Sequence, residues 1–418
     1  MTTLSDAPKE SFRLSMLIYD SRYRSLTIQF VALLGFMLVV AWLVSNTLQN
    51  LEALGKPIDF GFFSEPASYD INQRLIDYNS RDSHLRASFV GLLNTLLVAV
   101  MGCALATVMG VVIGVMRLSK NWMLSRIMTV YVEMFRNVPV LLWIVFFMAI
   151  LIETLPAPNA FRGENPSASM WLWDSLAVTN RGIYMPEPLF SRGLGDVSFF
   201  GAFNISLELI ALVVALIAGF WASGRIKARA DRIQEATGDR PTTWYLRLAA
   251  VVLPFAVILI LLGFHLGYPA LKGFNFQGGI HMRNSLIALW LALSFYTAAF
   301  IAENVRAGIL AVSGGQTEAA EALGLRPNRI MSLVVLPQAL RVIIPPLISQ
   351  YLNLTKNSSL AIAVGYMDIT GTLGGITMNQ TGRELECVLL LMLVYLIISL
   401  SISLVMNWYN KRVKLVER

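Results

Sequence analysis

Eight long apolar segments constrain the fold of this 418-residue chain more than any other feature. Of its residues, 56% are hydrophobic and only 14% are charged, which is the composition of an integral membrane protein. Each segment is long enough to cross about 30 Å of hydrocarbon as a helix, and a helix satisfies its own backbone polar groups in lipid. The segments lie near residues 26–48, 88–116, 125–152, 203–223, 246–266, 282–311, 336–361 and 387–409. We therefore expect an all-α membrane protein with about eight transmembrane helices.

The distribution of basic residues predicts the orientation of these helices. With a cytoplasmic N-terminus, the cytoplasmic segments hold 20 of the 33 Lys and Arg residues, and the opposite side holds ten over longer segments. Cytoplasmic loops carry the excess of Lys and Arg in membrane proteins. Eight crossings then place both termini in the cytoplasm, and the net charge of +7 reflects topology rather than nucleic-acid binding. The polar first 25 residues predict no cleavable signal peptide.

The sequence contains no arrangement typical of an enzyme or a metal site. Cys103 and Cys387 lie in or beside apolar segments, where buried small hydrophobic residues are the simplest interpretation. The three His residues show no ligand spacing. The chain has no G-x-x-x-x-G-K-[ST] loop for phosphate and no nucleophile–base motif. We therefore expect no enzyme activity, no metal and no cofactor in this chain, and no ATP hydrolysis by the chain alone.

A polar loop between the sixth and seventh apolar segments carries Glu318, Ala319 and Ala320, with Gly324 three residues further on. This pattern predicts a short helix over 316–323 that ends at Gly324, because a residue without Cβ readily adopts the left-handed cap conformation. A short, rigid helix that protrudes from a membrane domain suits a docking element. A solvated connector rich in Ala and Glu would have the same composition.

The two ends of this short helix are also marked in the sequence. Ser313 and Gln316 have the S-x-x-Q spacing of a capping box, which predicts a side-chain cap at the start. Pro327 suits the first turn of a following helix.

A second polar motif, Tyr131–Pro139, lies within the third apolar segment and reads YVEMFRNVP. Pro139 interrupts the helical hydrogen bonds before it. The freed carbonyl groups and the Arg136 guanidinium then need partners in protein or in a wet cavity, because lipid offers none. Alternatively, Arg136 is close enough to the cytoplasmic end of the segment to extend its head group to the surface.

In combination, these motifs resemble the permease subunits of ATP-binding-cassette importers. The loop resembles their EAA loop, with Val334 where Ile is usual. Tyr131–Pro139 resembles the Y-x-E-x-F-R-x-x-P motif of the polar amino acid family, with Asn137 and Val138 where Gly-Thr is usual. The match continues through residues 302–308, 336–341, 345–347 and 356–361.

The resemblance covers about 88–152 and 282–409 and implies a type I importer fold with a five-helix core and three extra helices. Residues 1–87 would be a cytoplasmic tail, an extra helix and a periplasmic segment, and 153–281 an insertion with a periplasmic segment and two extra helices. Residues 88–152 and 282–418 would form the core, the latter with the EAA loop. This long form resembles the general L-amino-acid and the glutamate/glutamine/aspartate/asparagine importers.

A zwitterionic ligand at membrane depth needs a cation for its carboxylate and an anion or carbonyl groups for its ammonium. Lys356 or Arg136 could face the carboxylate, and Asp368 the ammonium. Alternatively, Lys356 extends from the end of its helix toward lipid phosphate. Glu303 and Arg306 lie on one helix face and are expected to pair with each other. The candidate substrate residues are Arg136, Asn137, Lys356, Asn357, Ser358, Ser359 and Asp368.

The resemblance also implies partners and a mechanism. This chain and a second, homologous permease subunit would lie in the lipid of the bacterial inner membrane. A periplasmic amino-acid-binding protein would deliver the amino acid to them. A dimer of ATP-binding subunits, which bind the ATP, would move the helix around Glu318 and produce alternating access. A secondary transporter is the alternative class, but the sequence shows no repeated halves with interrupted helices. Within importers, another small polar solute is the alternative substrate.

Overall fold

The computed structural model describes residues 15–163, 165–199 and 203–413, in two units that meet between Gly61 and Phe62. The first unit contains α1 (Met16–Tyr19) and α2 (Ser21–Ala53). Residues 23–53 are long and apolar enough to span a membrane, and within this unit their side chains are mostly exposed. The extra N-terminal helix expected near 26–48 is therefore present.

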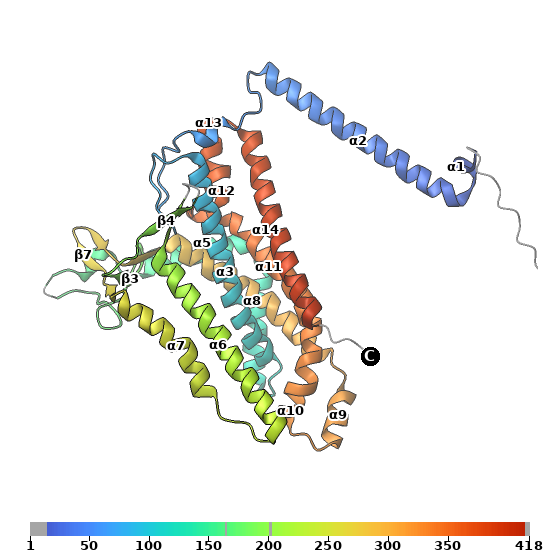
Figure 1. Ribbon diagram of the computed structural model, residues 1–418. Helices are drawn as coiled ribbons and strands as arrows, with labels where there is room; N and C mark the ends of the chain where they lie inside the picture. The colour runs from blue at the N-terminus through green and yellow to red at the C-terminus, as the bar shows by residue number, and fades with distance from the viewer. Residues whose placement is uncertain (1–14, 164, 200–202, 414–418) are drawn as a thin grey trace, which may run out of the picture. The chain divides into compact units, whose positions relative to one another are not determined.

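The second unit is mainly helical (Figure 1). Together with α2, its long helices provide eight segments that can span a membrane in the described residues, so the expected number is confirmed. The helices are α3 (His84–Arg117), α4 (Trp122–Asn137), α5 (Val140–Thr154), α6 (Leu207–Thr237), α7 (Trp244–Leu261), α8 (Asn284–Leu310), α9 (Gly314–Ala322), α10 (Pro327–Ile330), α11 (Leu336–Asn357), α12 (Ile369–Gly371), α13 (Met378–Thr381) and α14 (Glu384–Val413). Short 3₁₀ turns are η1 (Gly61–Ser64), η2 (Pro158–Phe161) and η4 (Ser358–Val364), and π-helical turns are η3 (Met331–Val335) and η5 (Thr372–Thr377).

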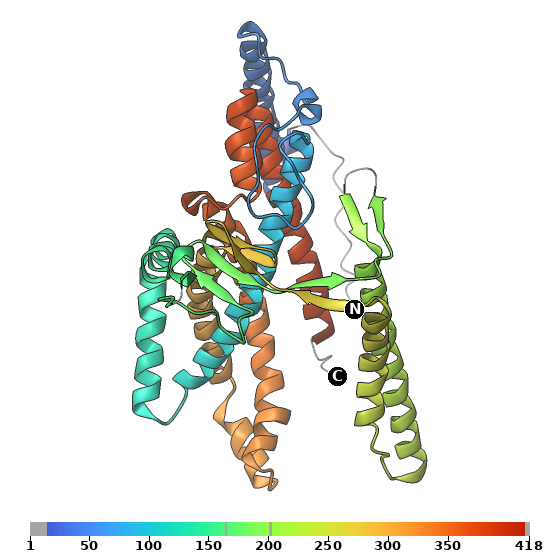
Figure 2. The same ribbon diagram turned by 90° about the vertical axis from the view of Figure 1, so that its left-hand side faces the viewer.

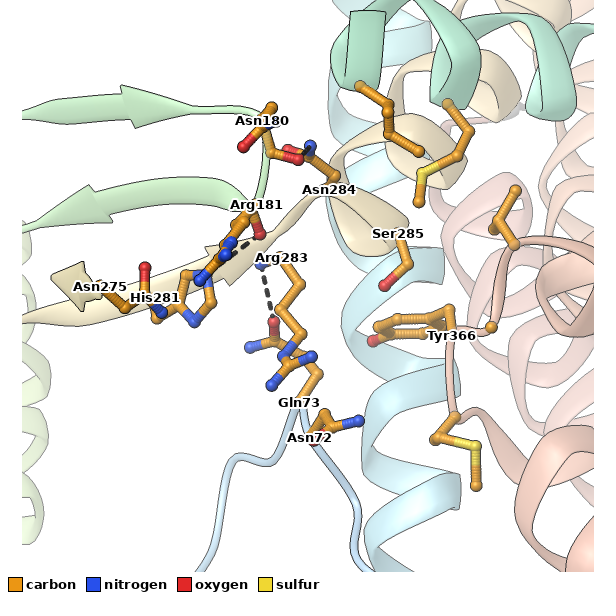
Figure 3. Close-up of a pocket in the computed structure, with 15 residues that line it drawn as sticks. Asn72, Gln73, Asn180, Arg181, Asn275, His281, Arg283, Asn284, Ser285 and Tyr366 are labelled. Carbon is orange, nitrogen blue, oxygen red and sulfur yellow. Dashed lines mark hydrogen bonds between the residues drawn. The ribbon is translucent and has the colours of Figure 1, made fainter. Parts of the chain in front are cut away.

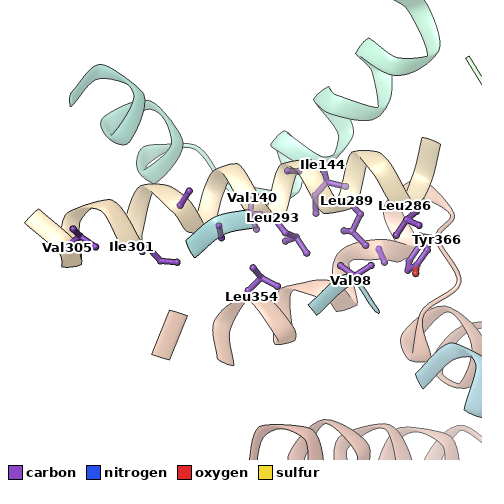
Figure 4. Close-up of a cluster of buried hydrophobic side chains, with 14 of the residues drawn as sticks. Val98, Val140, Ile144, Leu286, Leu289, Leu293, Ile301, Val305, Leu354 and Tyr366 are labelled. Carbon is purple, nitrogen blue, oxygen red and sulfur yellow. The ribbon is translucent and has the colours of Figure 1, made fainter. Parts of the chain in front are cut away.

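Helix α8 is the central helix of the second unit, and it packs against α3, α4, α5 and α11. Buried apolar side chains follow it from Leu286 at its start to Val305 near its end (Figure 4). Val98 from α3, Ile144 from α5 and Leu354 from α11 complete this cluster. In lipid, such packing rather than a hydrophobic driving force holds helices together.

Two glycines of α3 allow its close approach to α8. A Cβ added to Gly110 would lie 2.6 Å from Ile301 Cβ, and one added to Gly114 would lie 2.8 Å from the Ala302 carbonyl oxygen. Real Cβ atoms do not approach other atoms so closely, so larger residues would separate the helices. The small residues therefore allow the two helices to come together.

The third apolar segment is not one continuous helix. It divides at Pro139, which is the extended residue before α5, with φ −56° and ψ 137°. The spanning part begins at Val140, and the residues before it form the separate helix α4. The prediction of one span over 125–152 is therefore wrong in its first half, because proline cannot donate the hydrogen bond that would continue α4.

Residues 153–281 contain short antiparallel strands that the sequence did not lead us to expect. One sheet has the order β1–β2–β9, and three two-stranded sheets pair β3 with β6, β4 with β5, and β7 with β8. The strands are β1 (Ala177–Thr179), β2 (Gly182–Met185), β3 (Glu187–Phe190), β4 (Asp196–Phe199), β5 (Phe203–Ser206), β6 (Phe264–Gly267), β7 (Ala270–Lys272), β8 (Asn275–Gln277) and β9 (Ile280–Arg283). Strand β9 leads directly into α8, so this sheet is joined to the first turn of the central helix.

Helices α6 and α7 form a hairpin that stands apart from the core helices in the second view (Figure 2). They pack chiefly on each other, at Gly219, where an added Cβ would lie 2.8 Å from Val251 Cα. Glu208, whose partner the sequence did not indicate, lies in the first turn of α6 and accepts a hydrogen bond of 2.5 Å from the Leu194 backbone N–H.

Candidate functional site

The polar loop between α8 and α11 forms the predicted protruding helix, α9. Its Ala320 side chain is buried against Ile330 and Val335, which join α10 to α11. Glu318 and Ala319 are exposed on the opposite side. The helix is therefore anchored by one small side chain and presents the rest of its surface outward.

The sequence predicted the end of α9 correctly and its start wrongly. Gly324 has φ +76°, the left-handed conformation expected after the helix. Pro327 occupies the first turn of α10, also as expected. The capping box is wrong: α9 begins at Gly314, and the Ser313 side chain makes no cap hydrogen bond. Gln316 is the third residue of the helix, where a capping box would close, but without the Ser313 hydrogen bond the box is not formed.

An ion-pair cluster joins α3 to α8 close to α9. Glu303 Oε1 lies 2.6 Å from an Arg306 guanidinium nitrogen, which confirms the expected pair on α8. Its second oxygen pairs with Arg117 at the end of α3. The sequence did not indicate Arg117 as a partner, because the two residues are far apart along the chain.

Arg136 and Asn137 lie at the exposed end of α4 in this chain. The Arg136 guanidinium carbon is 5.5 Å from the centre of the Phe300 ring on α8, a cation–π arrangement. Asn137 Nδ2 donates to Glu133 Oε2 at 3.3 Å. Arg136 is therefore directed along the surface of α8 rather than into the buried core.

Asn357 lines a polar cavity of about 300 Å³ between α8 and α11. Phe300, the ring beneath Arg136, lines the same cavity. The other lining residues are Tyr296, Thr297, Gln350 and Asn353. The structure thus brings two candidate residues, Arg136 and Asn357, near the same aromatic ring.

Lys356 and Ser359 face a different cavity, of about 770 Å³, between the end of α11 and helix α14. Ser358 is buried, and its hydroxyl donates to the Thr355 carbonyl oxygen at 2.7 Å. The four consecutive candidates 356–359 therefore do not line one cavity, which corrects the prediction that they contact the substrate together. Successive residues on a helix point about 100° apart, so Lys356 and Asn357 serve different faces of α11.

Asp368 does not face Lys356 across a cavity, which corrects a second prediction. Its side chain is fully buried; one oxygen accepts from the Gly371 N–H at 2.8 Å and caps α12, and the other accepts from the Tyr395 hydroxyl at 3.3 Å. Burial raises the pKa of the Asp368 carboxyl to about 6. These contacts show that Asp368 caps a helix inside the protein.

A third cavity, of about 450 Å³, was missed by the sequence analysis (Figure 3). It lies at the start of α8 and is lined by polar residues, among them Arg181 and Arg283. Its walls come from six segments of the chain, so no local motif marks them.

Comparison with known proteins extends these observations. Residues 234–415 match the profile of the family described as "Binding-protein-dependent transport system inner membrane component". The chain is 59% identical to the glutamate/glutamine/aspartate/asparagine transport system permease protein BztB of Rhodobacter capsulatus, over 100% of both chains. It is 43% identical to the general L-amino acid transport system permease protein AapQ of Rhizobium johnstonii, over 98% of this chain and 96% of the relative.

A shorter relative and a solved structure show more distant similarity. The probable glutamine ABC transporter permease protein GlnM of Bacillus subtilis is 33% identical over 49% of this chain and 89% of its own length. The solved structure is described as "Crystal structure of an amino acid ABC transporter with histidines". It is 17% identical, with a TM-score of 0.44, over 79% of this chain and 95% of that chain.

Proposed function

The chain belongs to the amino-acid ABC transporter permeases, and from this premise we propose that it carries L-amino acids across the bacterial inner membrane by alternating access, driven by ATP that partner subunits hydrolyse. The observation that carries the proposal is the construction of α9. It is anchored through Ala320 to the start of α11, and Gly324 fixes its end, while Glu318 and Ala319 remain free to contact a partner. A force on α9 would therefore be transmitted to α8 and α11.

The proposal requires partners that this chain does not contain. A dimer of ATP-binding subunits would dock on α9 and bind ATP, since the sequence has no phosphate-binding loop and we expect no cofactor in the chain itself. A second, homologous permease subunit would complete the pathway, and a periplasmic amino-acid-binding protein would deliver the substrate. The segments 88–152 and 282–418 would form the transport core, and 1–87 and 153–281 would be additions to it.

We assign the end that carries α9, and both termini, to the cytoplasm. The excess of Lys and Arg on that side supports this orientation. Cysteines introduced near Arg229 and Lys414 should then react with a membrane-impermeant reagent only from the cytoplasm. Cysteines near Asn72 and Asn159 should react only from outside. Labelling of any of the four from the other side would contradict the orientation.

Two surfaces of α11 are candidates for substrate contact. The cavity with Asn357 and Phe300, beside Arg136 and Asn137, offers amide groups, an aromatic ring and a nearby cation. The cavity with Lys356 and Ser359 offers a cation and a hydroxyl group on a mainly apolar wall. Charged groups at membrane depth mark transport pathways often enough to make both surfaces worth testing.

Gly324→Val tests the coupling role of α9. The assembled transporter would be reconstituted in liposomes, and ATP hydrolysis and amino-acid uptake measured together. A β-branched residue at φ +76° is strained, so the end of α9 should shift, and uptake should be lost while ATP hydrolysis persists. Gly315→Ala is the matched control, because Gly315 has open space around it and no left-handed φ. Normal uptake by an inserted, assembled Gly324→Val transporter would contradict the proposal.

A further inference from the structure

The cavity at the start of α8 has features that the transport core does not explain. It measures about 450 Å³, within the usual range for small-molecule sites. Six segments form it: the polar stretch at Gln73, the end of α5, the turn between β1 and β2, strand β8, the junction of β9 with α8, and the loop around Tyr366 (Figure 3). In the orientation proposed above, it opens on the outer side of the membrane.

The cavity carries two cations without an opposing acid. Arg181 and Arg283 both line it, and none of the described lining residues is Asp or Glu. Among the described residues, neither arginine forms a salt bridge; Arg181 donates to the Phe274 carbonyl oxygen at 3.3 Å, and Arg283 Nε is buried without a partner. Arg283 is half-buried, and a partly desolvated cation without an anion favours a negatively charged ligand; the exposed Arg181 adds positive charge beside it.

His281 extends the polar wall without adding a third charge. Its ring stacks on Tyr184 with the ring centres 4.0 Å apart. Burial, together with the positive charge of Arg283, lowers the pKa of His281 below its usual value, so the ring is neutral near pH 7. It can therefore donate or accept a hydrogen bond beside the two guanidinium groups.

The first turn of α8 adds donors to the same cavity. This helix of 27 residues begins at Asn284, and the residue before it, Arg283, provides no side-chain cap. The amide groups at a helix N-terminus carry partial positive charge and bind anions. The Arg283 N–H donates to Gln73 Oε1 at 3.1 Å, and the Arg283 side chain does not cap the amides of the following turn.

Two buried oxygens give a second, independent indication of a ligand. Asn284 is only 3% exposed; its Nδ2 donates to the Asn180 carbonyl oxygen at 2.6 Å, but its Oδ1 has no partner. Asn180 Oδ1 is also buried without a partner. Unpaired buried acceptors are costly, and an ammonium group would satisfy them.

We infer that this cavity binds a free acidic amino acid at the outer mouth of the permease, before the amino acid enters the transmembrane pathway. The inference rests on the proposed function and deepens it. The two guanidinium groups and the start of α8 face the two carboxylates of the ligand, while Asn180 and Asn284 accept hydrogen bonds from its ammonium. A neutral amino acid leaves one of the cations unpaired and binds more weakly.

Direct binding measurements test this site separately from transport. The assembled transporter in lipid nanodiscs, without binding protein, would be titrated calorimetrically with L-glutamate, glutarate and L-glutamine. L-glutamate should bind most tightly, because glutarate lacks the ammonium and L-glutamine lacks the second carboxylate. Arg181→Met and Arg283→Met should each weaken L-glutamate binding about tenfold or more. Arg181 is exposed, so Arg181→Met keeps the test available if Arg283→Met fails to fold.

Arg192→Met is the matched control, because Arg192 is an exposed arginine of the same insertion that does not line the cavity. Unchanged L-glutamate binding in both cavity variants would overturn the inference. A second result would also overturn it: the variants bind L-glutamate normally, but the binding protein stimulates their ATP hydrolysis less. The two arginines would then contact an acidic side chain of the binding protein. A wild-type transporter that takes up no amino acid with ATP would instead overturn the proposed function, and it would leave the binding result standing.

Discussion

The α3–α8–α11 core and the α6–α7 hairpin are both built from long apolar helices, yet they differ in what these helices contact. Sixteen residues of α8 are buried, from Asn284 to Gly308, whereas none of the described residues of α7 is buried. The hairpin packs chiefly on itself, through Gly219. Apolar composition thus predicts that a segment spans the membrane, but it does not tell whether protein or another surface covers that segment. What covers a segment is decided by its contacts, such as the close approach of α3 to α8 at Gly110.

Gly110→Leu should have the largest effect on stability, and its comparison with Gly219→Leu tests the core and the hairpin separately. The new side chain would collide with Ile301 on α8, where even a Cβ lies at 2.6 Å. Overpacking of this kind costs about 1–3 kcal/mol or more, so thermal unfolding in detergent should shift strongly downward or folded protein should be lost. Gly219→Leu should open the hairpin against Val251 but leave the α3–α8 contact and its unfolding temperature nearly unchanged.

Gly224→Leu serves as the control for helix propensity and hydrophobicity, because nothing lies within 4 Å of an added Cβ there. Equal destabilisation by Gly110→Leu and Gly219→Leu would show that the hairpin and the core unfold as one body, and the comparison would fail.

Lys356→Met tests whether the core holds the substrate carboxylate at the outer end of α11. The change keeps the apolar stem and removes the charge. A charge-assisted hydrogen bond contributes about 1.5–3 kcal/mol, so uptake at limiting substrate should fall roughly ten- to a hundredfold. Lys227→Met, on the exposed surface of α6, is the matched control in the hairpin.

Asn357→Ala tests whether the substrate contacts the other face of α11. If the cavity shared with Phe300 holds the substrate, Asn357→Ala should lower uptake and Lys356→Met should not. If neither variant lowers uptake, the substrate contacts lie in the second permease subunit.

Excision of the hairpin should have a smaller effect than either change in the core. Strands β3 and β6 pair Phe190 with Phe264, so the chain ends left by removing residues 191–263 lie side by side. A short turn rich in Asn and Gly can join them. The shortened chain should fold and transport within a fewfold of the original. GlnM matches 49% of this chain over 89% of its own length, so a relative with a shorter chain exists. Loss of uptake by an assembled, shortened transporter would assign the hairpin a necessary role.

The sequence predicted those features that arise from local pattern and missed those that arise from spatial convergence. The number of spans and the left-handed Gly324 follow from residue type and spacing, and the structure confirms them. Ser313 directly precedes α9 and Gln316 is its third residue, as a capping box requires, but the Ser313 side chain makes no cap hydrogen bond.

The substrate residues show the limit more clearly. Lys356 and Asn357 are adjacent in sequence but face different cavities, because the helix turns between them. Conversely, Arg181 and Arg283 are distant in sequence but line the same cavity, through a sheet whose strands are too short to give a clear pattern. The family resemblance could not supply Arg181 either, because this residue lies in the insertion outside the matched segments.

Asp368→Asn should have the smallest effect on transport, and its pH dependence identifies the acid as a capping residue. Burial raises the pKa of Asp368 to about 6 from an ordinary 3.8, so the folded protein binds this proton more tightly than the unfolded chain does. Stability should therefore fall as the pH rises from about 4 to about 6, by at most about 3 kcal/mol, and the cost should be fully present above pH 6. Asparagine keeps an oxygen to accept the Gly371 N–H and has no charge, so thermal unfolding of the variant should lack this pH dependence while uptake is unchanged. A large loss of uptake by a stably folded Asp368→Asn protein would return the acid to the substrate pathway and would extend the functional part of the core beyond α11.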